Sequence, residues 1–131
     1  TGELIRRFGS LKIIYAGLLA FLLTTAVGFA GANVLHYWWA LVLLGLGWNF
    51  LFIGGTTLLA QNYLPQEKFK IQAINDFSIF VLQATASLAA GAILFAQGWS
   101  AIISIALVPT VLMVVALSTY LVHAKYRPAL D

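Results

Sequence analysis

The chain has 131 residues, of which 62% are hydrophobic and 8% are charged, with a net charge of +3. Soluble domains average about 45–50% apolar and about 25% charged residues, so this composition excludes a water-soluble globular protein and predicts that most of the chain lies in lipid. The sequence has no cysteine, and its seven cations form short clusters beside apolar runs, which excludes disulfides, thiol chemistry and a nucleic-acid-binding stripe.

Two long uncharged runs define the predicted helices. Positions 13–66 and 77–124 contain no Asp, Glu, Lys or Arg, and each run is long enough for two membrane helices of about 20 residues. Gly31 to His36 interrupts the first run, Gln97-Gly98 interrupts the second, and Pro65 lies in the polar loop between them. We therefore predict one all-α membrane domain over 1–131, with helices at about 11–30, 37–62, 72–96 and 100–123 and loops at 1–10, 63–71 and 124–131. The runs lack the alternation of a β-barrel.

The charges and aromatic residues predict the orientation. The connections at 31–36 and 97–100 carry no Lys or Arg, whereas the loops at the other end carry six of the seven and Lys12 follows directly after the first of them. The positive-inside rule then places both termini in the cytoplasm. Aromatic side chains gather at the opposite interface as a belt, namely Tyr37, Trp38, Trp39 and Trp99.

Few side chains suggest chemistry. His36 and His123 are predicted at opposite membrane faces, and no catalytic or metal-binding motif is present, so we predict no enzyme activity, no metal and no cofactor. Ionisable residues inside a membrane usually mark ion pathways, and none lies near the predicted midplane. Asp76 comes closest, in the first turns of the helix over 72–96, where it suits the helix dipole or a pairing with a basic loop residue.

Uncharged polar residues mark the second and third helices. Asn49 lies near the middle of the helix over 37–62, with Thr56 on the same helical stripe. Because an amide in hydrocarbon needs a partner, Asn49 either lines a cavity or makes an interhelical hydrogen bond, and both interpretations remain open. Gln83 is the corresponding candidate in the third helix, whose many small residues also predict close helix packing.

The first and fourth helices consist mainly of Leu, Ile, Val, Ala and Phe, so we expect both to face lipid. Pro109 is expected to kink the fourth helix, because proline removes one backbone hydrogen bond. The polarity is therefore confined to two of the four predicted helices.

The segment from Gly2 to Lys12 resembles the cytoplasmic loop signature of the major facilitator superfamily, approximately G-x-L-x-D-R-x-G-R-R/K. Gly2, Leu4, Arg7 and Gly9 match this pattern, whereas Arg6 stands where the acid is expected. The stretches 47–59 and 72–77 are similar to the tenth and eleventh helices of bacterial members. The sequence also opens on Thr1 rather than Met, and we expect a fragment of a longer protein.

The resemblance implies helices nine to twelve of a twelve-helix secondary transporter of the bacterial inner membrane, driven by protons or another gradient. Its expected partners are the bilayer, the remaining helices of the same transporter and a small-molecule substrate that the sequence does not identify. With the polar stripes, it implies a substrate cavity lined by Trp48, Asn49, Thr56 and Gln83. It further implies a cytoplasmic gate that includes Gly2, Arg7, Gly9 and Asp76.

Two other interpretations compete with the transporter fragment. A small multidrug exporter would need an acidic residue in its first helix, and the helix over 11–30 has none. A non-transporting four-helix membrane subunit would need no cavity, and Asn49 would then serve stability alone.

Overall fold

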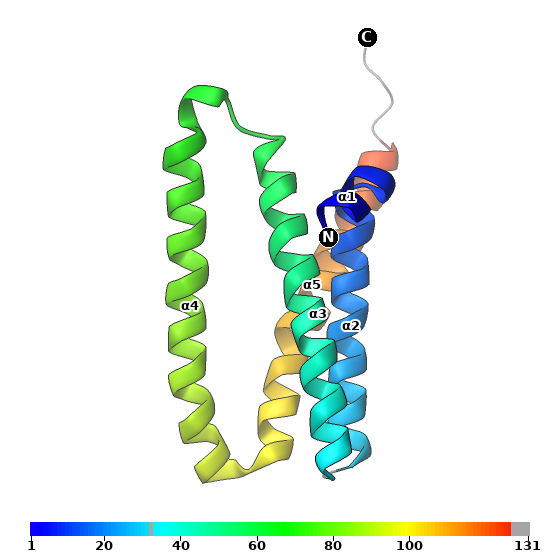
Figure 1. Ribbon diagram of the computed structural model, residues 1–131, viewed down its shortest axis with the longest axis vertical. Helices are drawn as coiled ribbons and strands as arrows, with labels where there is room; N and C mark the ends of the chain where they lie inside the picture. The colour runs from blue at the N-terminus through cyan, green and yellow to red at the C-terminus, as the bar shows by residue number, and fades with distance from the viewer. Residues whose placement is uncertain (32, 127–131) are drawn as a thin grey trace.

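The computed structural model describes residues 1–31 and 33–126, with side chains described as far as His123. Four helices are long and apolar enough to cross a membrane, which confirms the predicted all-α fold (Figure 1). In chain order the elements are α1 (Gly2–Phe8), α2 (Ser10–Ala30), α3 (Val34–Ala60), the short 3₁₀ helix η1 (Pro65–Glu67), α4 (Lys68–Gln97) and α5 (Trp99–Tyr126).

The loop that we expected over 1–10 is instead mostly helix α1. The Ile5 N–H donates to the carbonyl of Thr1 at 3.0 Å, and the Gly9 N–H donates to that of Ile5 at 2.8 Å. Gly9 then separates α1 from α2 with φ +86°, a conformation that glycine adopts without steric cost. The polar side chains of this segment therefore indicate an exposed helix rather than an irregular loop.

Two transmembrane helices begin earlier than predicted. Helix α3 begins at Val34, because the carbonyl of Asn33 already accepts hydrogen bonds from the N–H groups of His36 and Tyr37. Helix α4 begins at Lys68, directly after the 3₁₀ turn that starts at Pro65, so the loop predicted over 63–71 is partly helical. At the other end of the chain α5 continues to Tyr126, and the predicted tail at 127–131 lies outside the described residues.

Helices α2 and α3 pack closely through glycine. A Cβ atom placed on Gly17 would lie 3.0 Å from the carbonyl oxygen of Gly47, and a Cβ on Gly47 would lie 3.0 Å from that of Gly17. Small residues let helix backbones approach in this way. Helix α5 packs on the C-terminal part of α2, where Ile103 faces Gly28.

The first predicted helix, which we expected to face lipid, also packs against two neighbours, α3 and α5. Helix α2 is the most enclosed of the four spans, since 39% of the residues in its most apolar stretch are buried. Its leucines and isoleucines fit a helix interface as well as they fit lipid, because lipid tails are as apolar as leucine.

Helix α4 stands apart from α2 and α3 over most of its length (Figure 1). None of its residues is buried, and its contacts are with α5 and η1. The predicted close packing through its small residues is therefore not found among the described helices.

The junctions of α2 with α3 and of α4 with α5 lie at the same end of the molecule (Figure 1), and aromatic residues stand near the starts of α3 and α5 at these junctions. The Trp99 indole N–H donates to the carbonyl of Gly28 at 3.3 Å, and its ring meets Tyr37 edge-on with centroids 4.9 Å apart. Trp38 and Trp39 make a similar pair at 4.8 Å. These four rings share one end of the molecule, as the aromatic belt requires, while the side of the membrane on which it lies stays a prediction.

Candidate functional site

One face of α3 presents aromatic and polar side chains in succession. The rings of Trp48 and Phe52 stack at a centroid distance of 6.0 Å and an interplanar angle of 18°. One turn further on, the Thr56 hydroxyl donates to the carbonyl oxygens of Phe52 at 2.8 Å and Ile53 at 3.2 Å. Because its hydrogen is used within the helix, the Thr56 oxygen is available to a ligand only as an acceptor.

Asn49 has a partner from outside α3. The hydroxyl of Thr1 donates to its side-chain oxygen, which ties the segment before α1 to the middle of α3. The side-chain nitrogen of Asn49 donates no hydrogen bond within the described part of the chain, and the residue is exposed. Both predicted roles for Asn49, a structural bond and a ligand contact, are compatible with this arrangement.

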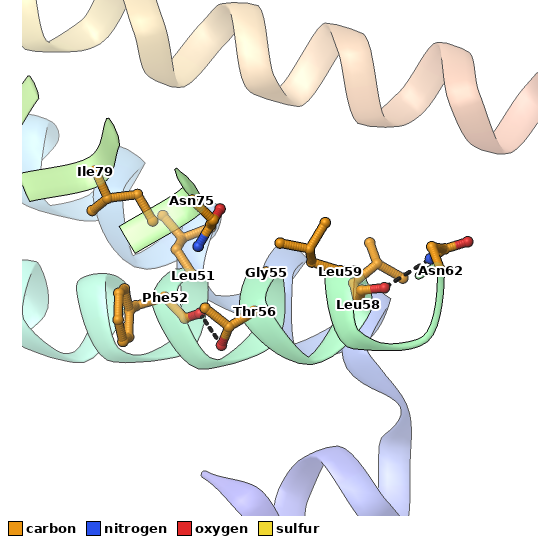
Figure 2. Close-up of a pocket in the computed structure, with 9 residues that line it drawn as sticks. All are labelled: Leu51, Phe52, Gly55, Thr56, Leu58, Leu59, Asn62, Asn75 and Ile79. Atoms are coloured by element: carbon orange, nitrogen blue, oxygen red, sulfur yellow. Dashed lines mark hydrogen bonds between the residues drawn. The ribbon is translucent and has the colours of Figure 1, made fainter. Parts of the chain in front are cut away.

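A cavity of about 400 Å³ lies between α3 and α4 (Figure 2). The cavity is open rather than enclosed, because α4 stands apart from α3 over most of its length. Its walls are mainly apolar, with polar groups from both helices. The lining residues are Leu51, Phe52, Gly55, Thr56, Leu58, Leu59 and Asn62 from α3 and the turn after it, and Asn75 and Ile79 from α4.

Two asparagines of this cavity are absent from the predicted site. The side-chain nitrogen of Asn62 donates to the carbonyl of Leu58 at 2.7 Å, and that of Asn75 donates to the carboxylate of Asp76 at 3.1 Å. Figure 2 shows Asn75 reaching from α4 toward Leu51, while Asn62 lies beyond the last turn of α3. Each amide keeps an oxygen and one N–H hydrogen that make no hydrogen bond within the described chain. The signal for Asn62 was available in the sequence, since it continues the helical spacing of residues 55 and 59.

The other predicted cavity residues lie outside these walls. Of the four, only Thr56 lines the cavity. Trp48 connects to it through its stack on Phe52, one turn further toward the middle of α3. Gln83 is exposed on α4, four residues beyond Ile79 and thus one turn along from the cavity wall.

The predicted gate residues are not brought together in the described chain. Gly2 is the first residue of α1, Gly9 follows its end, and Arg7 is exposed with its guanidinium 6.0 Å from the centre of the Phe8 ring. Asp76 is half-buried on α4 and accepts its hydrogen bond from the neighbouring amide. No ion pair joins Arg7 and Asp76 within the part of the chain that the structure describes.

Two details of this region differ from expectation. Arg6, which stands where the loop signature has an acid, pairs with Glu3 at 2.8 Å on the exposed side of α1. Asp76 lies eight positions after Lys68, where α4 begins, so it is outside the first turn. The field of a helix dipole falls off within that turn, and the helix-start role for Asp76 is therefore wrong.

Comparison with known proteins relates this chain to a membrane transporter. The chain is 40% identical over 119 residues to the riboflavin transporter RfnT of Brucella anthropi, in an alignment that covers 86% of this chain. The chain spans 30% of the length of that relative. No family model and no solved structure matches this chain. The chain is thus homologous to one part of a membrane transporter.

Proposed function

We propose that this chain is part of a secondary active transporter that moves riboflavin, or a closely related flavin, across the membrane by alternating access. The observation that carries the proposal is the identity of 40% to a riboflavin transporter over 86% of the chain. A transporter binds and releases its solute without chemical change, which agrees with a sequence that offers a polar stripe but no catalytic motif.

We further infer the twelve-helix architecture of the major facilitator superfamily, with this chain as helices nine to twelve. The loop signature that includes Gly2, Arg7 and Gly9 supports this inference, as do four membrane-spanning helices of which α3 and α4 carry the polar side chains. In such transporters two parallel halves rock about a site near the midplane, driven by an ion gradient. The basic loops then lie in the cytoplasm, with both termini of the transporter fragment on that side.

The α3 stripe suits a flavin. A flavin combines a flat fused ring with a polar edge and a hydroxylated side chain, and it therefore needs aromatic faces together with hydrogen-bonding groups. Trp48 and Phe52 supply aromatic faces, which stack well on flat heterocycles. Asn49 and Thr56 supply polar atoms on the same helix, and we assign Gln83 of α4 to the opposite wall of the path.

The proposed cytoplasmic gate depends on Gly9, the residue between α1 and α2. Gly9 has a positive φ and open space around its α-carbon, so the angle between the two helices can change without a steric clash at this residue. We propose that Arg7 and Asp76 approach each other when the cytoplasmic side of the complete transporter closes.

Uptake by the natural full-length protein tests this function. The protein is produced in a riboflavin auxotroph that lacks its own importer, and uptake of radiolabelled riboflavin is measured at matched membrane levels. We expect uptake from the wild-type protein and about tenfold less from Asn49→Ala, the loss that about 1.4 kcal/mol of binding would give. Asn33→Ala is the matched control, since it removes the same amide from the residue before α3, where the side chain makes no capping hydrogen bond.

The outcomes separate the alternatives. A well-expressed wild-type protein that takes up no riboflavin would refute the substrate. If Asn49→Ala transports riboflavin as the wild type does, Asn49 serves structure alone and its place on the substrate path is refuted.

A further inference from the structure

The cavity between α3 and α4 combines an aromatic face with two carboxamides. Phe52 lies on one side, and Asn62 and Asn75 contribute amides from separate segments (Figure 2). Leucine and isoleucine side chains complete the walls, and no charged residue is among them. A site of this composition suits a flat, neutral ring whose edge carries hydrogen-bonding groups.

We propose that Asn62 and Asn75 recognise the imide edge of the flavin ring in this cavity, a proposal that rests on the function proposed above. The imide presents a carbonyl, an N–H and a second carbonyl in a row. Each carboxamide has one oxygen that can accept from the N–H and one hydrogen that can be donated to a carbonyl. Bases in nucleic acids are read by amides in the same way.

The remaining contacts fix the ring around that edge. Phe52 stacks on the tricycle, and its own stack on Trp48 extends the aromatic surface toward the middle of α3. Thr56 can only accept, since its hydrogen is bonded to the helix backbone. Among the residues that line this cavity, the two asparagines therefore supply the N–H donors for the imide carbonyls.

Binding to the purified full-length protein in nanodiscs tests the proposal, with the quenching of flavin fluorescence as the signal. The probes are riboflavin and 3-methylriboflavin, in which a methyl group replaces the imide hydrogen. We expect the wild type to bind riboflavin at least about tenfold more tightly than the methylated analogue, because a site built to hydrogen-bond a group rejects the analogue that lacks it. The imide has one N–H, so this ratio should fall toward one in the alanine variant, Asn62→Ala or Asn75→Ala, that removes the accepting oxygen.

Two further variants make the result specific. Gln61→Ala removes an exposed amide beside Asn62 that does not line the cavity, and it should leave the ratio unchanged. The Asn62 side chain also caps the last turn of α3, so Asn62→Ala can destabilise the protein. If this variant is not recovered from membranes, riboflavin binding by Asn75→Asp tests the proposal instead. This substitution keeps the shape of the side chain, replaces its donors with oxygen, and should lower riboflavin affinity about tenfold or more.

If the wild type binds riboflavin but the ratio stays the same in both alanine variants, the imide site is refuted while the proposed function stands. If the wild type neither binds nor transports riboflavin, both are refuted.

Discussion

The contact between α2 and α3 should not tolerate a single added methyl group at Gly47. A Cβ there would lie 2.5 Å from Cδ1 of Phe21 and 3.0 Å from the carbonyl oxygen of Gly17. The first contact involves a side chain that can rotate, whereas the second involves the backbone of a packed helix. Gly47→Ala therefore forces α2 and α3 apart or displaces Phe21.

The loss of stability in Gly47→Ala can be worked out by comparison with a second glycine of the same helix. Gly45→Ala adds the same methyl group into open space, and both substitutions share the gain in helix propensity of about 1 kcal/mol. Overpacking in a tight interface costs about 1–3 kcal/mol. Gly47→Ala should therefore be less stable than Gly45→Ala by about 1–3 kcal/mol.

The assay is thermal unfolding of the full-length protein in detergent, followed by tryptophan fluorescence at one fixed scan rate because membrane proteins often unfold irreversibly. We expect a lower apparent Tm for Gly47→Ala than for Gly45→Ala. The double variant Gly47→Ala with Phe21→Leu should lose less than the sum of the single losses, since the ring no longer blocks the methyl group. Equal Tm values for the two alanine variants would refute the close contact between the helices.

Two more predictions concern the substrate path and the orientation. Trp48→Ala should raise the KM for riboflavin uptake about tenfold, because stacking on an aromatic ring is worth about 1–3 kcal/mol per base, while Trp48→Phe keeps most of the affinity; equal KM values for both variants would remove Trp48 from the path. This chain has no cysteine. In a full-length protein whose remaining cysteines have been replaced, a cysteine at Asn33 should react with a membrane-impermeant maleimide added to intact cells, whereas one at Gln66 should react only after permeabilisation. The reverse pattern would invert the proposed topology.

The number and approximate extent of the long helices could be predicted because charge, proline and glycine act locally. Pro65 and Gly98 mark the breaks that the structure contains, and lipid leaves an apolar run little choice but a helix. Helix α1 was missed because its polar composition is equally typical of a loop. Only the backbone hydrogen bonds from Ile5 and Gly9 distinguish the two.

The packing of α2 could not be predicted for a different reason. Gly17 and Gly47 are thirty positions apart, and their contact depends on how two helices cross. An apolar helix surface suits lipid and a neighbouring helix alike, because membranes offer no hydrophobic contrast between them. Composition therefore did not identify α2 as the most enclosed span.

The candidate site was predicted in part. Periodicity along α3 identified Thr56, because residues on one stripe recur every three or four positions. Asn62 and Asn75 were missed because they lie near the ends of the predicted helices, where amides usually face water. The chain reversal at Pro65 brings both to one cavity, and this closure depends on the path of the loop rather than on either helix alone.

The two sides of α4 differ in polarity, and this difference indicates what surrounds the helix in the complete protein. At about 100° per residue, Gln72, Asp76, Gln83 and Ser87 fall on one side of this helix. The opposite side carries Phe77, Leu88 and Phe95, whose exposures of 71%, 81% and 93% suit lipid. Polar side chains within a membrane span are costly unless they meet protein or water.

Within the described chain the polar face of α4 has no packed neighbour, since no residue of α4 is buried. A complete four-helix subunit would leave Gln83 and Ser87 in contact with lipid chains, at a cost that a single apolar substitution could remove. A transporter with a water-filled path beside α4 removes that cost while keeping the apolar face in the bilayer. The two-sided pattern of this helix therefore favours the proposed transporter over an isolated four-helix subunit.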